Sequence, residues 1–190
     1  MKKSQLNLVR VCQIGMVAGI CAIIAPISLP TGVIPITLAT LTAIMAGILL
    51  PPISAAVSQI VYIMLGVVGL PVFSNWRGGV GMVVGPTGGF ILAFPLLAFA
   101  VSFAILLAER RTESPVKLRI FAGIGMLFGQ IVFFTIGAIW FSVVTGNDFA
   151  TTMNIAVIGF LPGEAIKMAF AVGVIIEVRR QLKKAVPQLY

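Results

Sequence analysis

The sequence predicts an all-α integral membrane protein built from six transmembrane helices. Of its 190 residues, 59% are hydrophobic and 9% are charged, and the mean hydropathy is +1.14. Apolar runs of about 20 residues, the length an α-helix needs to cross a bilayer core of about 30 Å, recur along the chain. Because these runs fill nearly the whole sequence, we expect residues 1–190 to form a single transmembrane domain.

Prolines separate the first three predicted spans. The first apolar run covers residues 11–29, and we interpret it as a retained helix because it is long for a signal peptide and lacks a convincing small-x-small cleavage site. The second span is predicted over 36–50 and the third over 53–70. The breaks fall at Pro26, Pro30, Pro35, Pro51 and Pro52.

Glycine and charge set the next boundaries. A glycine-rich stretch at 71–89 precedes the fourth span, which is predicted over 90–108. The charged loop at 109–119 then leads into a fifth span over 120–143, which the Thr-Gly-Asn-Asp sequence at 145–148 closes.

The last span is predicted to begin at Pro162, since proline is favoured in the first turn of a helix, and to end at Arg179 and Arg180. The preceding residues, 149–161, are apolar but contain threonine and asparagine. We expect them to form a short helix or a re-entrant connection.

The basic residues orient the predicted spans. With six spans both termini share a side, and eleven of the thirteen lysines and arginines fall there. These are Lys2, Lys3, Arg10, Arg110, Arg111, Lys117, Arg119, Arg179, Arg180, Lys183 and Lys184. Lysine and arginine concentrate in cytoplasmic loops, so both termini are predicted to be cytoplasmic in a multi-pass protein of the cell (plasma) membrane. This asymmetry, with attraction to anionic lipids of the bilayer, accounts for the net charge of +8 without a nucleic-acid partner.

Several kinds of chemistry are excluded by what the sequence lacks. It contains no histidine, which rules out histidine triads and histidine metal sites. Cys12 and Cys21 lie nine residues apart on one predicted helix, too far to bridge, and we interpret them as packing residues. No GxxxxGK[ST] motif occurs, so any ATP-driven activity requires another subunit to bind the nucleotide. We therefore expect no enzyme activity, cofactor or metal site.

Glu164 and Lys167 are the main candidate site. They lie three positions apart at the start of the last predicted span, so their side chains share one helix face near free backbone N–H groups. One interpretation is an ion pair that only neutralises itself at the outer membrane boundary. The alternative is a pair that faces a cavity and binds a substrate, as ionised groups within spans commonly do.

The glycine-rich stretch is a second candidate. Its glycines allow tight folding, Phe73 and Trp76 offer apolar surface, and Asn75 and Arg77 offer polar groups. It can act as a lid over an outward-facing pocket, or as a plain extracellular loop that Trp76 anchors at the membrane interface.

Small residues line one face of two predicted spans. Gly15 and Gly19, and also Ala18 and Ala22, are four apart in the first span, as are two glycines in the fifth. Such faces allow helices to approach closely, either inside the protein or against a partner.

Three segments resemble a known family when taken together and in order. They are PITLATL at 35–41, GLPVFSNWRGGVGMVVGPTGGF at 69–90 and LPGEAIK at 161–167. In a chain of this length they resemble the biotin-specific substrate-binding subunit, the S component of the BioY family, of energy-coupling-factor (ECF) vitamin transporters. This chain departs from the family pattern at Glu164, where the pattern has aspartate. Because glutamate is one methylene longer, the contact geometry of its carboxylate differs from that of the family's aspartate.

The resemblance implies a high-affinity biotin pocket near the outer face, closed by the loop between the first two spans and the loop between the third and fourth. The ureido group of biotin has two N–H donors and one carbonyl acceptor, which suits Glu164 as acceptor and Lys167 as donor or as the neutralising partner of Glu164. Arg77 or Asn75 is expected to bind the valerate carboxylate, and Phe73 and Trp76 to contact the apolar ring. The remaining expected pocket residues are Thr37, Thr87, Gly88 and Gly163.

The implied mechanism is transport without chemistry on the substrate. The S component captures biotin outside and topples in the membrane, within a complex with an ECF transmembrane coupling protein and two cytosolic ATPase subunits. Ala18 and Ala22 are expected to dock the coupling protein. The alternatives are an S component for another small vitamin, a self-sufficient secondary transporter and a membrane-embedded enzyme. The two halves of the sequence show no obvious repeat, which does not favour a secondary transporter with inverted repeats. One intramembrane acid is weak support for catalysis.

Overall fold

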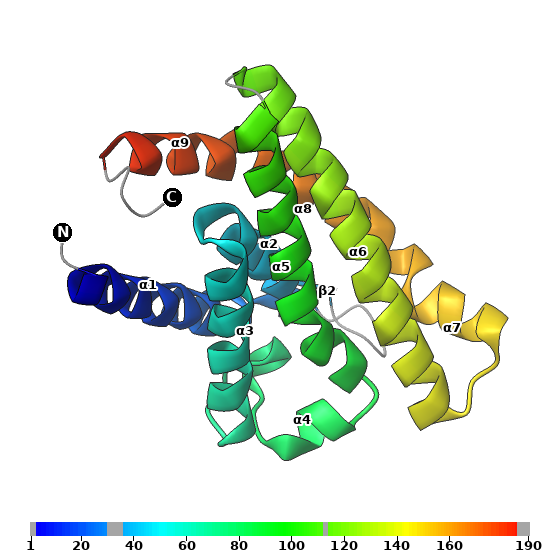
Figure 1. Cartoon of the computed structure of the whole chain (residues 1–190). Helices are drawn as coiled ribbons and strands as arrows, with labels where there is room; N and C mark the ends of the chain where they lie inside the picture. The colour runs from blue at the N-terminus through cyan, green and yellow to red at the C-terminus, as the bar shows by residue number, and fades with distance from the viewer. Residues whose placement is uncertain (1–2, 30–35, 112–113, 186–190) are drawn as a thin grey trace.

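The structure, a computed structural model, describes residues 3–29, 36–111 and 114–185. Two short strands are its departure from the purely helical chain that the sequence predicts. Figure 1 shows that helices make up almost all of it. Within the described residues, four helical stretches are long and apolar enough to cross a membrane: Asn7–Ile24, Gly88–Arg111, Val116–Thr145 and Ala150–Lys184. The second and third predicted spans are shorter helices, at 11 and 16 residues.

The first half of the chain contains three helices and a small β-ladder. Helix α1 (Lys3–Ile24) ends before Pro26, earlier than the predicted end at residue 29, because proline cannot continue the backbone hydrogen bonds of a helix. Strands β1 (Ser28–Leu29) and β2 (Ile36–Thr37) then pair antiparallel. Helices α2 (Ala39–Leu49) and α3 (Pro52–Val67) follow, with the break at the predicted prolines.

The glycine-rich stretch is more structured than a simple loop. It forms a 3₁₀ turn, η1 (Ser74–Trp76), and a short helix, α4 (Val80–Val84), before α5 begins. Helices α5 (Gly88–Arg111) and α6 (Pro115–Thr145) are the two longest in the described chain. Both extend beyond the predicted spans, since their polar ends continue the helices past the apolar runs.

The C-terminal part is divided into short pieces. Helix α7 (Phe149–Ala156), capped by the Asp148 side chain, and the 3₁₀ turn η2 (Ile158–Phe160) confirm the short helix predicted over 149–161. Helix α8 (Leu161–Phe170) has proline in its first turn, as predicted. It passes through a π-helical turn, η3 (Ala171–Ile175), into α9 (Ile176–Ala185).

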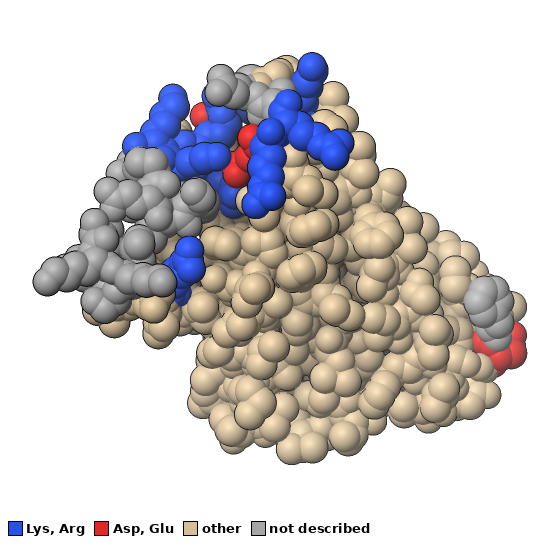
Figure 2. Space-filling view, in the orientation of Figure 1, with Lys and Arg blue, Asp and Glu red and all other residues tan. Residues whose placement is uncertain are grey.

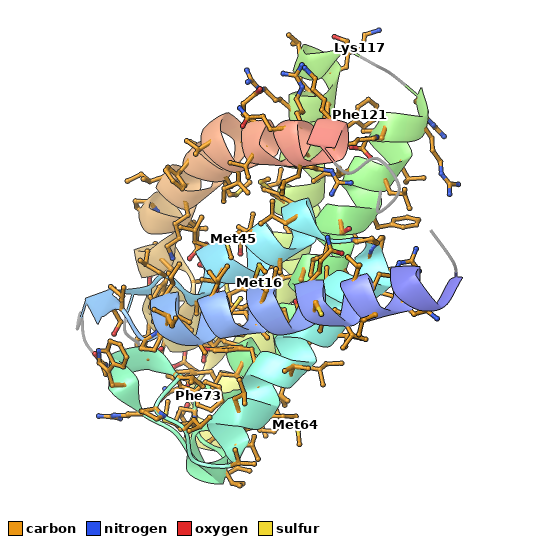
Figure 3. All side chains as sticks on the ribbon, turned by 90° about the vertical axis from the view of Figure 1, so that its left-hand side faces the viewer. Met16, Met45, Met64, Phe73, Lys117 and Phe121 are labelled. Atoms are coloured by element: carbon orange, nitrogen blue, oxygen red, sulfur yellow. The ribbon has the colours of Figure 1, made fainter. Side chains whose placement is uncertain are left out.

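Helix α5 lies at the centre of the bundle, packed against α6, α3 and α2. Its contact with α6 is close because Gly125 and Gly129 face Ala104 and Leu97, and a Cβ at either glycine would collide with α5. The small-residue face of α6 therefore serves internal packing. Helix α1 crosses α3 and α2 on one side and runs crosswise to α5 in both views (Figures 1 and 3), so its outer face is left uncovered by the described helices.

Most of the charged residues visible in Figure 2 gather at one end of the molecule, where α5 ends, α6 begins and α9 crosses them. Arg179 of α9 is buried there and donates to Glu109 of α5 at 3.0 and 3.2 Å. It also donates to the carbonyl of Ile48 at the end of α2. Lys183 contacts Glu109 at 3.2 Å, so this ion cluster joins three helices.

Candidate functional site

Four buried polar side chains form one cluster within the helical bundle. Lys167 Nζ lies 2.6 Å from Glu164 Oε1 and donates to Thr40 Oγ1 at 2.9 Å. Thr40 donates in turn to Glu164 Oε1 at 2.8 Å, and Gln130 Nε2 donates to Glu164 Oε2 at 2.6 Å. All four are less than a tenth exposed. Ionised groups are costly inside a membrane unless they are paired and hydrogen-bonded, and this cluster meets both conditions.

Three helices position the cluster. Glu164 and Lys167 lie one turn apart on the buried face of α8, which begins only three residues before Glu164. Thr40 is the second residue of α2, and Gln130 lies near the middle of α6. Neither Thr40 nor Gln130 was among the predicted site residues. The site thus depends on contacts between segments up to 127 positions apart.

Beside the cluster is a small cavity of about 60 Å³ with largely aromatic walls. Two members of the polar cluster, Glu164 and Thr40, belong to its wall. Lys167 contacts both of them but is not part of the wall. The remaining wall residues are Thr37, Ala39, Tyr62, Phe73, Ser74, Thr87, Phe90, Ile91, Phe94, Phe133, Phe134, Ala156 and Phe160. The cavity therefore presents one carboxylate to a compartment otherwise suited to a flat, apolar ring.

A larger groove of about 870 Å³ lies on the other side of Glu164. One face of α6, from Leu127 to Val143, lines it together with α7 and α8. Most of its lining side chains are apolar, and Gln130 is one of the few polar ones. Glu164 and Phe134 belong to the walls of both spaces, so they separate the cavity from the groove.

The loop that carries η1 closes one side of the cavity. Phe73 is 1% exposed and packs edge-on against Tyr62, with ring centroids 5.8 Å apart. Its ring occupies the space where a Cβ at Gly66 would lie, so glycine is required at that position. Figure 3 labels Phe73 at the lower end of the molecule, above Met64.

The same loop is joined to the segment after α1. Ser28 Oγ donates to Asn75 Oδ1 at 2.8 Å and accepts from the Asn75 backbone N–H at 3.1 Å. Asn75 and Trp76 have positive φ angles of 58° and 57°, a region that costs non-glycine residues free energy. These contacts hold the turn in place, with the Asn75 side chain committed to Ser28.

The structure brings together part of the predicted site. Glu164, Phe73, Thr37 and Thr87 line the cavity. The other predicted residues lie outside its wall: Lys167, Asn75, Trp76, Arg77, Gly88 and Gly163. Trp76 is 61% exposed and Asn75 and Arg77 are also exposed, because the turn directs their side chains away from Phe73. Gly88 is a packing position at the start of α5, where a Cβ would collide with the Val83 carbonyl.

The two residues of the predicted docking pair, Ala18 and Ala22, face the core of the protein to different extents. Ala18 is 1% exposed, because it lies on the face of α1 that packs into the core. Ala22 is half-buried against the same core. The outward face of α1 instead carries Gly15, Gly19 and Met16, and a Cβ added at either glycine would meet nothing within 4 Å.

Tyr62, Gln130 and the phenylalanines of α5 and α6 were missed as site residues. Only Gln130 carries a signal in the sequence, since an amide within a long apolar run needs a hydrogen-bond partner. Phenylalanine in a span gives no such signal, because it suits lipid contact and cavity lining equally well.

The fold and the site together define a class: a polytopic helical membrane protein whose bundle encloses a small aromatic cavity beside a buried carboxylate–ammonium pair. The model of the BioY family matches residues 1–184. The chain therefore belongs to the BioY family.

Its relatives include proteins from distant organisms. A probable biotin transporter BioY of Bacillus subtilis is 31% identical over 182 residues, covering 93% of this chain and 94% of the relative. A probable biotin transporter BioY of Pyrococcus horikoshii is 30% identical over 172 residues, covering 90% and 94%. The crystal structure of the S component for biotin from an ECF-type ABC transporter matches with a TM-score of 0.81 and 26% identity, over 95% of both chains.

Proposed function

We propose that this chain captures biotin in the aromatic cavity and delivers it across the membrane as the S component of an ECF-type ABC transporter. Membership of the BioY family and the similarity to a biotin S component support this assignment. The observation that carries it is the Glu164 carboxylate, paired with Lys167 yet present in the wall of an otherwise apolar cavity. An ion pair that served packing alone would have no reason to border a cavity.

Biotin suits this site chemically. A ureido N–H can donate to Glu164, and the apolar bicyclic ring can pack against Phe73, Phe94 and their neighbours. Lys167 acts as the neutralising partner of Glu164, since it reaches the site through Glu164 and Thr40.

The η1 loop supplies the remaining predicted contacts. Arg77 is exposed and carries the positive charge that the valerate carboxylate needs at the cavity mouth. Asn75 becomes available only when its bonds to Ser28 break. Trp76 is exposed beside Arg77, and Gly88 and Gly163 lie at the starts of α5 and α8.

The membrane orientation follows from charge. We assign six membrane segments, with α2 and α3 as the short second and third, and the basic end formed by α5, α6 and α9 in the cytoplasm. Both termini then lie in the cytoplasm and the cavity lies toward the outer face. An ECF transmembrane coupling protein and two cytosolic ATPases complete the transporter.

Titration of the purified chain distinguishes biotin from other vitamins. With biotin, desthiobiotin, thiamine and riboflavin as ligands in isothermal calorimetry, we expect tight saturable binding of biotin, weaker binding of desthiobiotin and none of the other two. Thiamine or riboflavin binding instead would assign the chain to another substrate, and an absence of all binding would contradict the proposal.

The outward face of α1 is the proposed docking surface for the coupling protein. Gly15→Leu with Gly19→Leu is expected to abolish biotin uptake in cells that contain the coupling module while leaving biotin binding unchanged, because bulky side chains there prevent close helix approach without touching the core. Gly123→Leu with Gly173→Leu is the matched control, since a Cβ at these glycines also meets nothing within 4 Å. Equal uptake by both double variants would refute the docking role.

A further inference from the structure

We infer that Gln130 is a positioning residue for substrate binding: it orients the Glu164 carboxylate through a hydrogen bond at the wall of the groove. This inference rests on the proposed function, because it concerns how the same carboxylate is presented to biotin. It gives a specific role to a side chain that lies outside the cavity wall.

The hydrogen bonds around Glu164 leave one favourable direction for a ligand. Thr40 and Lys167 both donate to Oε1, and Gln130 donates to Oε2. A carboxylate has about four acceptor directions, two on each oxygen. With two used on Oε1 and one on Oε2, the remaining acceptor direction is on Oε2, the oxygen that Gln130 holds. Gln130 thus determines which direction is left for a ureido N–H.

The amide of Gln130 has a single productive orientation. Its Oε1 is buried and has no hydrogen-bond partner in the described structure, whereas its Nε2 is 2.6 Å from Glu164. Rotating the amide by 180° would place an oxygen against a carboxylate oxygen, and two acceptors repel. An unsatisfied buried carbonyl costs free energy, so the bond to Glu164 is the interaction that explains a glutamine at this position.

Gln130 also bonds Glu164 at the wall of the groove that both residues line. Gln130 and Glu164 both line the large groove, whose other walls are mostly apolar and belong to spanning helices. A carboxylate bordering such a groove is costly, and a neutral amide bonded to it lowers that cost. Gln130 can therefore orient Glu164 without adding a second charge.

Gln59 provides a matched control within the same bundle. It is fully buried, and its Oε1 is likewise unpartnered. Its amide nitrogen, however, donates to Cys21 and Ser58 and not to Glu164. Changes at Gln59 thus report on the cost of altering a buried glutamine away from the site.

The test compares biotin affinity in three variants of the purified full chain, each relative to wild type at about pH 5.5 and about pH 8. Gln130→Met keeps the length but removes the donor, so we expect affinity to fall about tenfold or more at both pH values. Gln130→Glu is expected to lose more than about tenfold at the higher pH and to recover at the lower pH, where a proton on one of the two adjacent carboxyl groups restores a donor. Gln59→Met should lower thermal stability without weakening binding.

The charged groups near position 130 are Glu164 and Lys167, both on α8. Of the neighbouring side chains on other helices, Thr40 on α2 is a neutral hydroxyl and Tyr62 on α3 lies in the cavity wall. Normalising to wild type at each pH removes their contribution and that of the biotin carboxylate. If wild type binds biotin and both Gln130 variants bind as tightly without dependence on pH, this inference is overturned while the proposed function stands. If wild type does not bind, the proposed function fails. Should Gln130→Met not fold, the pH ratio of Gln130→Glu decides.

Discussion

Replacing Lys167 with methionine is expected to reduce biotin affinity by more than about a hundredfold and to destabilise the protein. The substitution leaves the Glu164 carboxylate buried and without its cation, which costs about 3–5 kcal/mol in comparable buried pairs. Each 1.4 kcal/mol corresponds to about tenfold in an equilibrium constant, so a cost of about 3–5 kcal/mol corresponds to about a hundredfold or more. With a cost of this size, Glu164 cannot keep both its charge and its position in the site. Affinity can be measured by calorimetric titration and stability by thermal unfolding in detergent.

The double variant Glu164→Gln with Lys167→Met separates the two explanations of this pair. It removes both charges, while the oxygen of the new amide can still accept from Gln130 and its NH2 can donate to the Thr40 hydroxyl, so stability should return most of the way to the wild-type value. If the charges serve the substrate, biotin binding stays weak in the double variant. If binding also returns, the pair serves only to neutralise itself, and the assigned role of Glu164 is wrong.

Prolines and charged residues predicted the parts of the fold that depend on local chemistry. The breaks before α3 and α8 follow from proline at the start of each helix, and the short α7 follows from polar residues in an apolar segment. Hydropathy overestimated the lengths of the helices in the second and third spans, because an apolar run does not show how many of its residues are helical. Thr37, for example, belongs to a strand and not to α2.

The candidate site was only partly predictable because half of its polar cluster depends on tertiary contacts. Glu164 and Lys167 stand out in the sequence as opposite charges in an apolar run. Thr40 does not, since a threonine in a helix can bond to its own backbone and needs no distant partner. Its bonds to residues 124 and 127 positions away appear only when α2 packs beside α8.

The outward face of α1 was likewise not predictable from the sequence alone. Two small-residue pairs overlap on α1, offset by three positions, and spacing alone does not show which pair faces the core. Packing against α3 and α2 buries Ala18, whereas Gly15 is exposed and Gly19 is half-buried with open space where a side chain would lie. Here the orientation of the helix, and not its composition, determines which residues can meet a partner.

Arg179→Met is expected to cause a large loss of stability at the end of the molecule where the charged residues gather. Arg179 is 3% exposed, and its guanidinium bonds both oxygens of Glu109 and the carbonyl of Ile48. Removing it leaves the poorly exposed Glu109 carboxylate paired with the more exposed Lys183 and breaks a link between α9, α5 and α2. The cost of about 3–5 kcal/mol for a broken buried pair corresponds to a fall in melting temperature of roughly 10 °C for a chain of this size.

Arg180→Met is the matched control for this prediction. Arg180 pairs with Glu177 at 2.9 Å, but both side chains are more than a third exposed, so the pair contributes about 0–1 kcal/mol. Thermal unfolding should therefore show a large shift for the Arg179 variant and almost none for the Arg180 variant. Because the Arg179 cluster shares no residue with the cavity wall, biotin affinity below the melting temperature should be unchanged in both. Equal shifts would mean that burial of the Arg179 pair adds nothing to the link between α9 and the bundle.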